Sequence, residues 1–215
     1  MPGHFRKNRR RATDLAQVDF PPEQKEVLSH VEDLLAEDGS TLAAATSELR
    51  YIYVSGEPGT GKTEVMIHAC PRAALSGCHV LIMCPTGTLV HSYRDWVPDH
   101  PNIIVETIHS ALVLKRWYDA AVQYAPPSRL RRYDLIMIDG VAQTDDDLLE
   151  KLRMAITELP KRLVLPVLLS GDFYQLGPMA AQRAILRWLL DYFSSARYPK
   201  LRASLGAVRS RQSSM

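Results

Sequence analysis

Five short runs of nearly continuous apolar residues alternate with longer segments in which apolar residues recur at helical spacing. Such runs predict strands that are covered on both faces of a sheet, because a half-exposed strand would alternate apolar with polar residues. The predicted strands span residues 51–55, 79–84, 103–107, 133–139 and 163–170. The predicted helices span about residues 22–37, 62–76, 87–97, 109–124, 145–159 and 179–195.

The order of these elements predicts the architecture. A helical segment follows each predicted strand, which is typical of a doubly wound α/β protein. We therefore expect a mostly parallel sheet of about five or more strands with helices on both faces. Pro166 lies inside the fifth run and cannot donate a backbone hydrogen bond, so we expect either a bulge there or a strand that starts after it.

The segment GEPGTGKT, residues 56–63, follows the first predicted strand directly and begins the next helix. It fits the pattern GxxxxGK[ST], whose glycines let backbone N–H groups turn toward phosphates. Lys62 can reach the β- and γ-phosphates, and the Thr63 hydroxyl can ligate Mg²⁺. The segment therefore predicts a nucleoside-triphosphate site. Its nucleotide-binding residues are Gly56, Glu57, Pro58, Gly59, Thr60, Gly61, Lys62 and Thr63.

A second carboxylate usually holds the hydrated metal from the end of a neighbouring strand. Asp139 ends the apolar run LIMID and fits this role. The next residue, Gly140, has no group that could orient or deprotonate an attacking water, so we expect weakened hydrolysis unless Asp145, Asp146 or Asp147 substitutes. Those three acids are more typical of the first turn of the following helix, where negative charge is favourable.

A third element, SGDFYQL at residues 170–176, ends the fifth apolar run. A glutamine at the carboxyl edge of a parallel sheet can reach the γ-phosphate or its attacking water. Alone, Gln175 would be interpreted as an ordinary loop residue. Beside two nucleotide motifs it is predicted to act with Lys62 and Asp139 as the catalytic set.

The formal net charge of +2 conceals an acidic body between two basic ends. Residues 1–11 and 197–215 each hold five Lys and Arg and no acid, so the middle keeps 16 of the 26 bases against all 24 acids. The ends are either solvated disordered tails or arms that contact nucleic acid or serve as import signals. We expect an N-terminal arm over residues 1–19, one ATPase domain over 20–196 and a C-terminal tail over 197–215.

The composition, 46% hydrophobic and 23% charged, is typical of a soluble globular protein. No apolar run approaches the roughly 18 residues that a membrane span needs, and the basic start does not continue into a secretory signal. The three cysteines lack paired CxxC spacing, which favours core thiols in a reducing compartment over zinc or disulfides. We expect an intracellular protein of the nucleus or mitochondrion with no membrane partner.

Taken in order, the motifs resemble the first RecA-like domain of superfamily-one DNA helicases of the 5′-to-3′ PIF/RecD type. The resemblance covers about residues 20–180. Its most specific parts are residues 56–63, which match motif I, and GDFYQL, which matches the GDxxQL of motif III. Asp139 begins motif II. Weaker similarities join FPPEQ at residues 20–24 to the Q motif, CPTG at 84–87 to motif Ia and TIHS at 107–110 to an element of this branch.

The resemblance implies ATP and Mg²⁺ as cofactors, single-stranded DNA as partner, and roles in DNA repair, recombination and telomere maintenance. It assigns adenine recognition to Gln24 and DNA contact to Pro85, Thr86, Gly87, His109 and Ser110. Both DNA segments follow predicted strands and so lie at the ligand-binding edge of the sheet. Their hydroxyl and imidazole groups can bond phosphate or sugar without reading bases.

Plainer interpretations stay open for two sets of residues. His109 could be a neighbour of a helix cap that faces the core. The three tryptophans, Trp96, Trp117 and Trp188, are more typical of core residues than of base-stacking platforms.

The chain departs from the family in two ways. Glu follows the motif II Asp in the family, whereas Gly140 follows it here. The family also has a second RecA-like domain with an arginine that completes the ATP site, and only some 35 residues follow motif III here. We therefore expect a truncated, degenerate or split helicase domain that hydrolyses ATP slowly and needs a second domain or a partner chain in trans to unwind DNA.

Two alternatives remain. One is a non-catalytic pseudo-helicase module that binds ATP and single-stranded DNA and acts through a partner. The other is a different P-loop enzyme, such as a small kinase or an AAA-type ATPase, against which TIHS and GDxxQL count.

Overall fold

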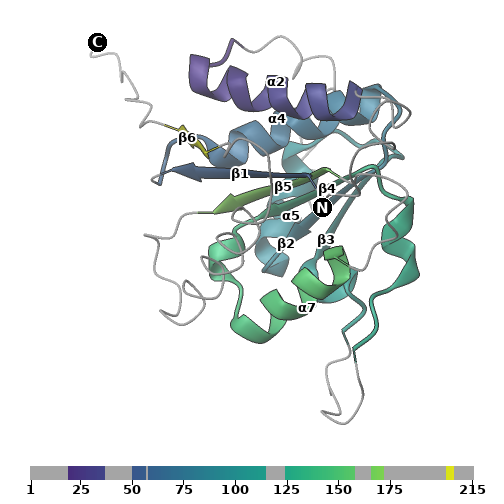
Figure 1. Cartoon of the computed structure of the whole chain (residues 1–215). Helices are drawn as coiled ribbons and strands as arrows, with labels where there is room; N and C mark the ends of the chain where they lie inside the picture. Colours follow the sequence, from purple (N-terminus) through teal and green to yellow (C-terminus); the bar gives the residue numbers. More distant parts are fainter. Residues whose placement is uncertain are drawn as a thin grey trace, which may run out of the picture.

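The computed structural model describes residues 19–36, 50–56, 58–114, 124–157, 166–171 and 202–205, and in them strands alternate with helices (Figure 1). The strands are β1 (Arg50–Gly56), β2 (Val80–Cys84), β3 (Ile103–Thr107), β4 (Leu135–Asp139), β5 (Pro166–Gly171) and β6 (Arg202–Leu205). The α-helices are α2 (Pro22–Ala36), α4 (Lys62–Leu75), α5 (Gly87–Trp96), α6 (Ile108–Ala111) and α7 (Asp146–Thr157). Two 3₁₀ turns, η1 (Ser128–Arg132) and η2 (Val141–Gln143), flank β4.

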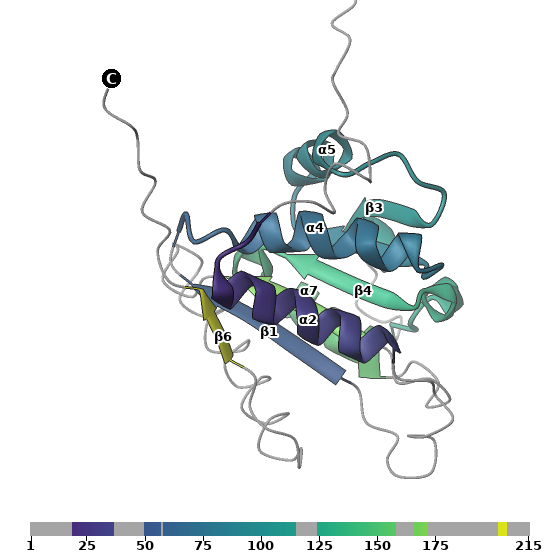
Figure 2. The same ribbon diagram turned by 90° about the horizontal axis from the view of Figure 1, so that it is seen from above.

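The described strands form one parallel sheet in the order β3-β2-β4-β5-β1-β6. Helices α2 and α4 lie on one side of this sheet and α7 on the other (Figures 1 and 2). The predicted α/β class, parallel sheet and two-sided helical cover are therefore confirmed.

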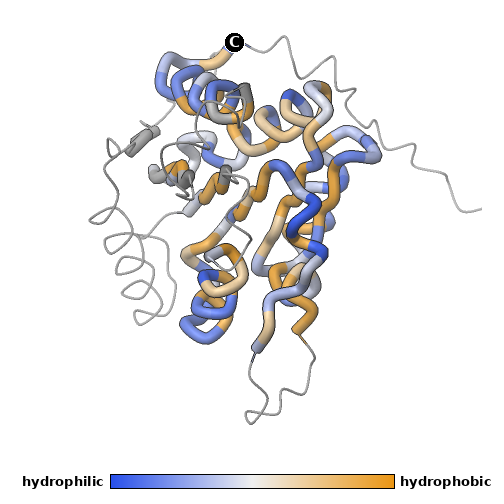
Figure 3. Tube along the Cα trace, turned by 45° about the vertical axis from the view of Figure 1, so that its right-hand side comes forward, coloured by the Kyte–Doolittle hydropathy of each residue, from blue (hydrophilic) through white to orange (hydrophobic). Residues whose placement is uncertain are grey.

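The continuous apolar runs are explained by two separate cores, one on each face of the sheet. In β4, Leu135 and Met137 belong to the core under α2, α4 and α5, whereas Ile136 and Ile138 belong to the core under α6 and α7. Successive side chains of a strand point to opposite faces, so each face needs its own apolar set. The hydrophobic positions accordingly concentrate along the central strands (Figure 3).

Strand β5 begins at Pro166 itself, paired with Arg50 and continuing without a bulge. The prediction of a bulge or a later start was therefore wrong. The first position of a strand tolerates proline, because the missing N–H is not needed by the ladder there.

The helix predicted over residues 109–124 was also wrong, because α6 ends at Ala111. Val113 takes a φ of 56°, in the left-handed region that a β-branched residue rarely adopts. The N–H of Val113 donates to Ser110 O (3.1 Å) and the N–H of Leu114 donates to His109 O (2.9 Å). This pair of bonds closes a helix end, so apolar spacing alone gave too long a helix.

Some predictions concern residues outside the described part. These are the helix over 179–195, Trp117 and Trp188. Strand β6 falls in the segment assigned to the basic C-terminal tail, where it pairs with β1, and the domain boundaries stay a prediction. Among the described helices, none is both long and apolar enough to cross a bilayer.

Candidate nucleotide site

The predicted phosphate cradle is the turn between the end of β1 and the start of α4. Gly59 and Gly61 have φ angles of 79° and 84°, a left-handed conformation that glycine adopts without steric cost. The turn leads into the first turn of α4, where the partial positive charge of a helix N-terminus favours an anion. The glycine-rich turn thus lies between a strand and a helix, as expected, and its binding of phosphate stays a prediction; Glu57 lies outside the described residues.

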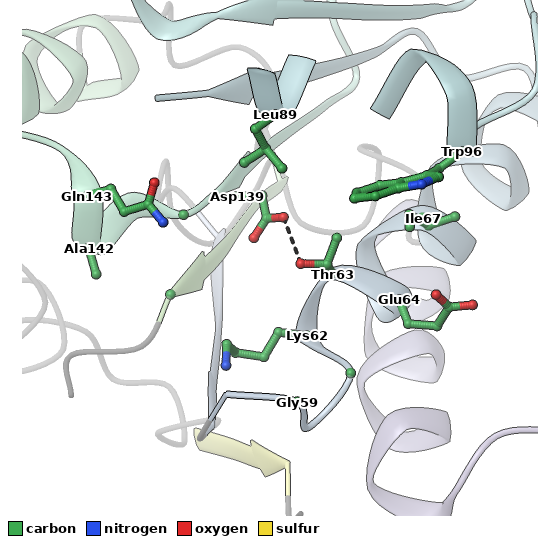
Figure 4. A pocket seen from close by; sticks show the side chains of 13 residues that line it. Gly59, Lys62, Thr63, Glu64, Ile67, Leu89, Trp96, Asp139, Ala142 and Gln143 are labelled. Atoms are coloured by element: carbon green, nitrogen blue, oxygen red, sulfur yellow. Dashed lines mark hydrogen bonds between the residues drawn. The ribbon is translucent and has the colours of Figure 1, made fainter. Parts of the chain in front are cut away.

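Lys62 folds back over this turn. Its Nζ donates a hydrogen bond to Gly56 O at 2.6 Å, and the side chain lines the cavity beside the loop (Figure 4). The ammonium group is therefore held at the loop, beside the cavity.

The structure brings the two predicted metal ligands together. Thr63 Oγ1 donates to Asp139 Oδ2 at 3.0 Å, from the first turn of α4 to the end of β4 (Figure 4). Asp139 is only 5% exposed. A hydroxyl and a carboxylate oxygen at a cavity are the ligands that Mg²⁺ prefers, so these residues fit the metal that the resemblance implies.

Tyr93 of α5 completes the surroundings of Asp139 and was not predicted. Its Oη donates to the same oxygen, Asp139 Oδ2, at 2.7 Å. Burial, and then the negative charge of Asp139, raise the pKa of Tyr93 well above its ordinary value, so the hydroxyl keeps its proton and remains a donor. In the sequence, Tyr93 looked like one more apolar position of a helix.

Gly140 has a backbone conformation that favours glycine, and it offers no side-chain group for catalysis. Its φ is 73°, and a Cβ added there would lie 3.3 Å from Pro85 Cγ and 3.7 Å from Leu89 Cδ2. The residue precedes η2, which turns the chain so that Gln143 lines the cavity (Figure 4). Gln143 was not predicted, because no motif marks an amide three residues after Gly140.

A cavity of about 580 Å³ joins these groups. The predicted residues that line it are Gly59, Gly61, Lys62, Thr63, Asp139 and Gly140, and the others are Glu64, Ile67, Leu89, Trp96, Ala142, Gln143 and Gly171. Trp96 is 39% exposed and meets the Tyr93 ring edge-on, with ring centres 5.7 Å apart. The expectation of a core position was therefore wrong for Trp96.

Gln24 contacts the back of the cradle. It is 5% exposed, and its Nε2 donates to Thr60 O at 3.1 Å. A Cβ on Gly61 would lie 2.4 Å from the same nitrogen, so the amide and the loop are closely packed. Gln24 is not among the described residues that line the cavity, and its contact with adenine stays a prediction.

The predicted DNA-contacting residues follow β2 and β3 at the carboxyl edge of the sheet. Thr86 caps α5, its Oγ1 accepting from Leu89 N at 3.3 Å, and Gly87 begins that helix. Thr86, Gly87, His109 and Ser110 are exposed, whereas Pro85 is half-buried. His109 therefore does not face the core.

An unpredicted ion pair braces the short helix α6. Arg129 donates to both carboxylate oxygens of Glu106, at 3.1 and 2.6 Å, and also to the carbonyls of Ser110 and Ala111. The Ser110 hydroxyl donates to Glu106 Oε2 at 3.2 Å. The bond to Glu106 raises the pKa of Arg129. The pair joins residues that are 23 positions apart, which no local pattern reveals.

The acidic cluster after Gly140 belongs to a helix start, as its sequence suggested. Asp145 Oδ1 accepts from Leu148 N at 2.8 Å, and Asp147 pairs with Lys151 one turn later. None of the three acids is among the described residues that line the cavity. Gln175, the third predicted catalytic residue, lies outside the described part.

Comparison with known proteins agrees with this fold. A family model described as an AAA domain matches residues 40–181. A structure of DNA unwinding at forked duplex DNA by two coordinating Pif1 helicases superposes with a TM-score of 0.51 and 17% identity, covering 82% of this chain and 38% of that one. The Pif1 helicase from Candida albicans gives 0.55 and 18%, covering 88% and 40%.

At identities this low, the superpositions show a shared fold and nothing finer. They confirm the resemblance to PIF/RecD-type helicases at the level of the fold. The chain spans about 40% of the length of these helicase chains. Among curated proteins, no sequence matches it significantly.

Proposed function

Because the chain belongs to the AAA domain family and has the fold of the RecA-like domain of Pif1 helicases, we propose that it is the ATP-binding domain of a PIF/RecD-like DNA helicase. The observation that carries the proposal is the Thr63–Asp139 pair beside the glycine cradle. A cradle alone could bind many anions. A cradle with a hydroxyl–carboxylate pair at its mouth is suited to a triphosphate with its metal.

In this proposal the chain holds Mg·ATP with groups from three places. The N–H groups of the loop and of the α4 N-terminus would hold the phosphates, and Lys62, which now donates to Gly56 O, would donate to a phosphate oxygen instead. Thr63 and Asp139 hold the metal, which when bound offsets negative charge on the β- and γ-phosphates. Gln24, on α2, would contact adenine, as the resemblance implies.

Hydrolysis is proposed to be slow, because no carboxylate follows Asp139. Gln175 would orient the attacking water or sense the γ-phosphate but could not take its proton. A missing general base costs on the order of 10²-fold or more in rate.

Single-stranded DNA is the proposed partner at the carboxyl edge of the sheet. The exposed Thr86, Gly87, His109 and Ser110, with Pro85, offer hydrogen bonds to phosphate and sugar there. The 5′-to-3′ polarity follows from the resemblance alone. Unwinding would further need a second RecA-like domain, or a partner chain in trans, since movement depends on a cleft that opens and closes.

The test measures ATP binding by calorimetry and DNA-stimulated hydrolysis, for the wild type and for Lys62→Ala. We expect Mg²⁺-dependent ATP binding that Lys62→Ala weakens at least tenfold, with slow turnover. Robust turnover by the wild type would contradict the impaired chemistry, and absence of ATP binding would overturn the whole proposal.

A second candidate is a non-catalytic module that binds ATP and single-stranded DNA and acts through a partner. Gly140 favours it, because the left-handed backbone at that position opposes a return to Glu. Hydrolysis that stays undetectable with DNA and with a helicase second domain added in trans would favour this module over a slow enzyme.

A further inference from the structure

Two donors converge on a single oxygen of the metal-binding carboxylate. Tyr93 Oη lies 2.7 Å and Thr63 Oγ1 lies 3.0 Å from Asp139 Oδ2. Within the described part of the chain, no donor lies on the other oxygen, Oδ1. The carboxylate is therefore held by one oxygen and presents the other.

Tyr93 can exert this hold because it is fixed in place. The side chain is 0% exposed and packs in the core with Val90 and Val97, while Trp96 meets its ring at 62° on the cavity side. A buried phenol in a defined position donates at little cost in side-chain entropy, unlike a mobile surface group.

We propose that Tyr93 is a positioning residue for the metal site, orienting Asp139 so that Oδ1 is available to the water shell of Mg²⁺. The inference rests on the proposed Mg·ATP binding. Thr63 can ligate the metal through a lone pair and still donate its proton to Asp139, so its bond alone would let the carboxylate turn about that contact. The second donor removes this freedom.

Filling the core does not require the hydroxyl. A phenylalanine on the same face of α5 would pack the same volume and avoid burying a polar atom that must find a partner. The hydroxyl of Tyr93 acts on Asp139, to which it donates its hydrogen bond. Tyr93→Phe removes this bond and keeps the ring.

The experiment measures ATP affinity by calorimetry, once with excess Mg²⁺ and once with EDTA, and takes the ratio as the gain due to metal. We expect Tyr93→Phe to reduce this gain about tenfold or more, as the loss of one hydrogen bond to a charged group does. The affinity in EDTA should change little, because the cradle is untouched. Tyr133→Phe is the matched control, because Tyr133 is buried before the start of β4, at the amino end of the parallel strands. This variant should keep the full gain in affinity due to metal.

A general loss of folding would lower both affinities together, so the ratio separates positioning from packing. In an Asp139→Asn background, Tyr93→Phe should have no further effect on the ratio, because its action passes through that carboxylate. An unchanged gain in Tyr93→Phe, or a reduction that persists with Asp139→Asn, would overturn the positioning role while leaving ATP binding intact. If the wild type binds ATP in neither condition, the proposed function fails, and the role of Tyr93 fails with it.

Discussion

Thr63 and Asp139 are 76 positions apart in the chain, and their side-chain oxygens lie 3.0 Å apart. The contact exists because β1 and β4 flank β5 in a parallel sheet, which brings their carboxyl ends to one edge. A helix that starts after β1 and a carboxylate that ends β4 then meet at that edge.

Removing either member of this pair should abolish most of the metal-dependent affinity. We expect Thr63→Ala and Asp139→Asn each to weaken ATP binding in Mg²⁺ about tenfold or more, since each deletes a proposed ligand and leaves the other without its partner. Calorimetry checks this. Thr157→Ala, an exposed threonine at the end of α7, is the control and should bind as the wild type does. Equal ATP affinities for the wild type and the three variants would show that Thr63 and Asp139 take no part in binding.

Gly140→Glu restores a carboxylate at a position whose φ is 73°. A left-handed conformation costs a residue with a Cβ about 1–2 kcal/mol, so Glu and Ala at this position should destabilise the fold by about the same amount. Urea unfolding measures that cost, and Gly140→Ala serves as the control without a carboxylate. An unfolding free energy that Gly140→Ala leaves unaltered would contradict a left-handed backbone at position 140.

The same pair of variants decides what limits hydrolysis. If a general base is the missing part, Gly140→Glu should exceed Gly140→Ala in turnover by on the order of 10²-fold. Equal rates would instead point to another requirement, such as an arginine supplied by a second RecA-like domain, or to a module that does not hydrolyse ATP.

Sequence patterns predicted the glycine-rich turn, Lys62, Thr63 and Asp139, and the structure brings these residues together at one cavity. Each of these predictions depends on residue type at a fixed distance from a strand end. They missed Tyr93 and the Glu106–Arg129 pair. These contacts depend on how α5 and η1 pack against the sheet, and a tyrosine on an apolar helix face looks like core. The Gly140 backbone was missed for a related reason: the sequence shows that a carboxylate is lacking, whereas the positive φ comes from the turn into η2.

Gln24 offers a test of two roles that its position allows. Gln24→Ala removes a buried bond to Thr60 O and should destabilise the fold by about 1–2 kcal/mol in urea unfolding. If the amide also reads adenine, the variant should lose its preference for ATP over GTP, while binding of tripolyphosphate changes less. Retained preference with reduced stability would make Gln24 a support of the loop only.

The cysteines should react in order of burial. Burial, and then the charge of Asp139, raise the pKa of Cys84 to about 12, and burial raises that of Cys70, so both thiols stay protonated and shielded at pH 8. Cys78 is half-buried and should be alkylated first by iodoacetamide, followed by mass spectrometry. All three should react in urea, and early labelling of Cys84 in the native protein would contradict the described core.

The raised thiol pKa also sets a direction for stability. An unfolded chain releases the Cys84 proton near pH 9, whereas the folded chain keeps it until about pH 12. The contribution of the buried, protonated Cys84 thiol to the free energy of unfolding is therefore complete below pH 9 and is lost as the pH rises from 9 to 12. Urea unfolding should show a steeper fall over this window for the wild type than for Cys84→Ser, whose hydroxyl does not titrate.

Arg129 allows a controlled test of whether α6, at the carboxyl edge of the sheet, contacts DNA. Arg131 lies in the same 3₁₀ turn and is a matched control for the loss of one positive charge. Arg129→Ala leaves Glu106 with the Ser110 hydroxyl but without its ion-pair partner, and it releases the carbonyls of Ser110 and Ala111, so α6 loses most of its support. We expect a stability loss of about 1–3 kcal/mol and severalfold weaker binding of single-stranded DNA. Arg131→Ala should reduce both the stability and the affinity for single-stranded DNA by less than Arg129→Ala does.

A salt titration then distinguishes bracing from direct contact. A residue that neutralises a phosphate lowers the slope of log affinity against log salt by about 0.7 for a single strand when it is removed. Arg129→Ala should weaken DNA binding with the slope retained, because its guanidinium is engaged with Glu106. A slope that drops for Arg129→Ala would make it a phosphate ligand instead, and wild-type affinity in that variant would show that α6 does not contact DNA.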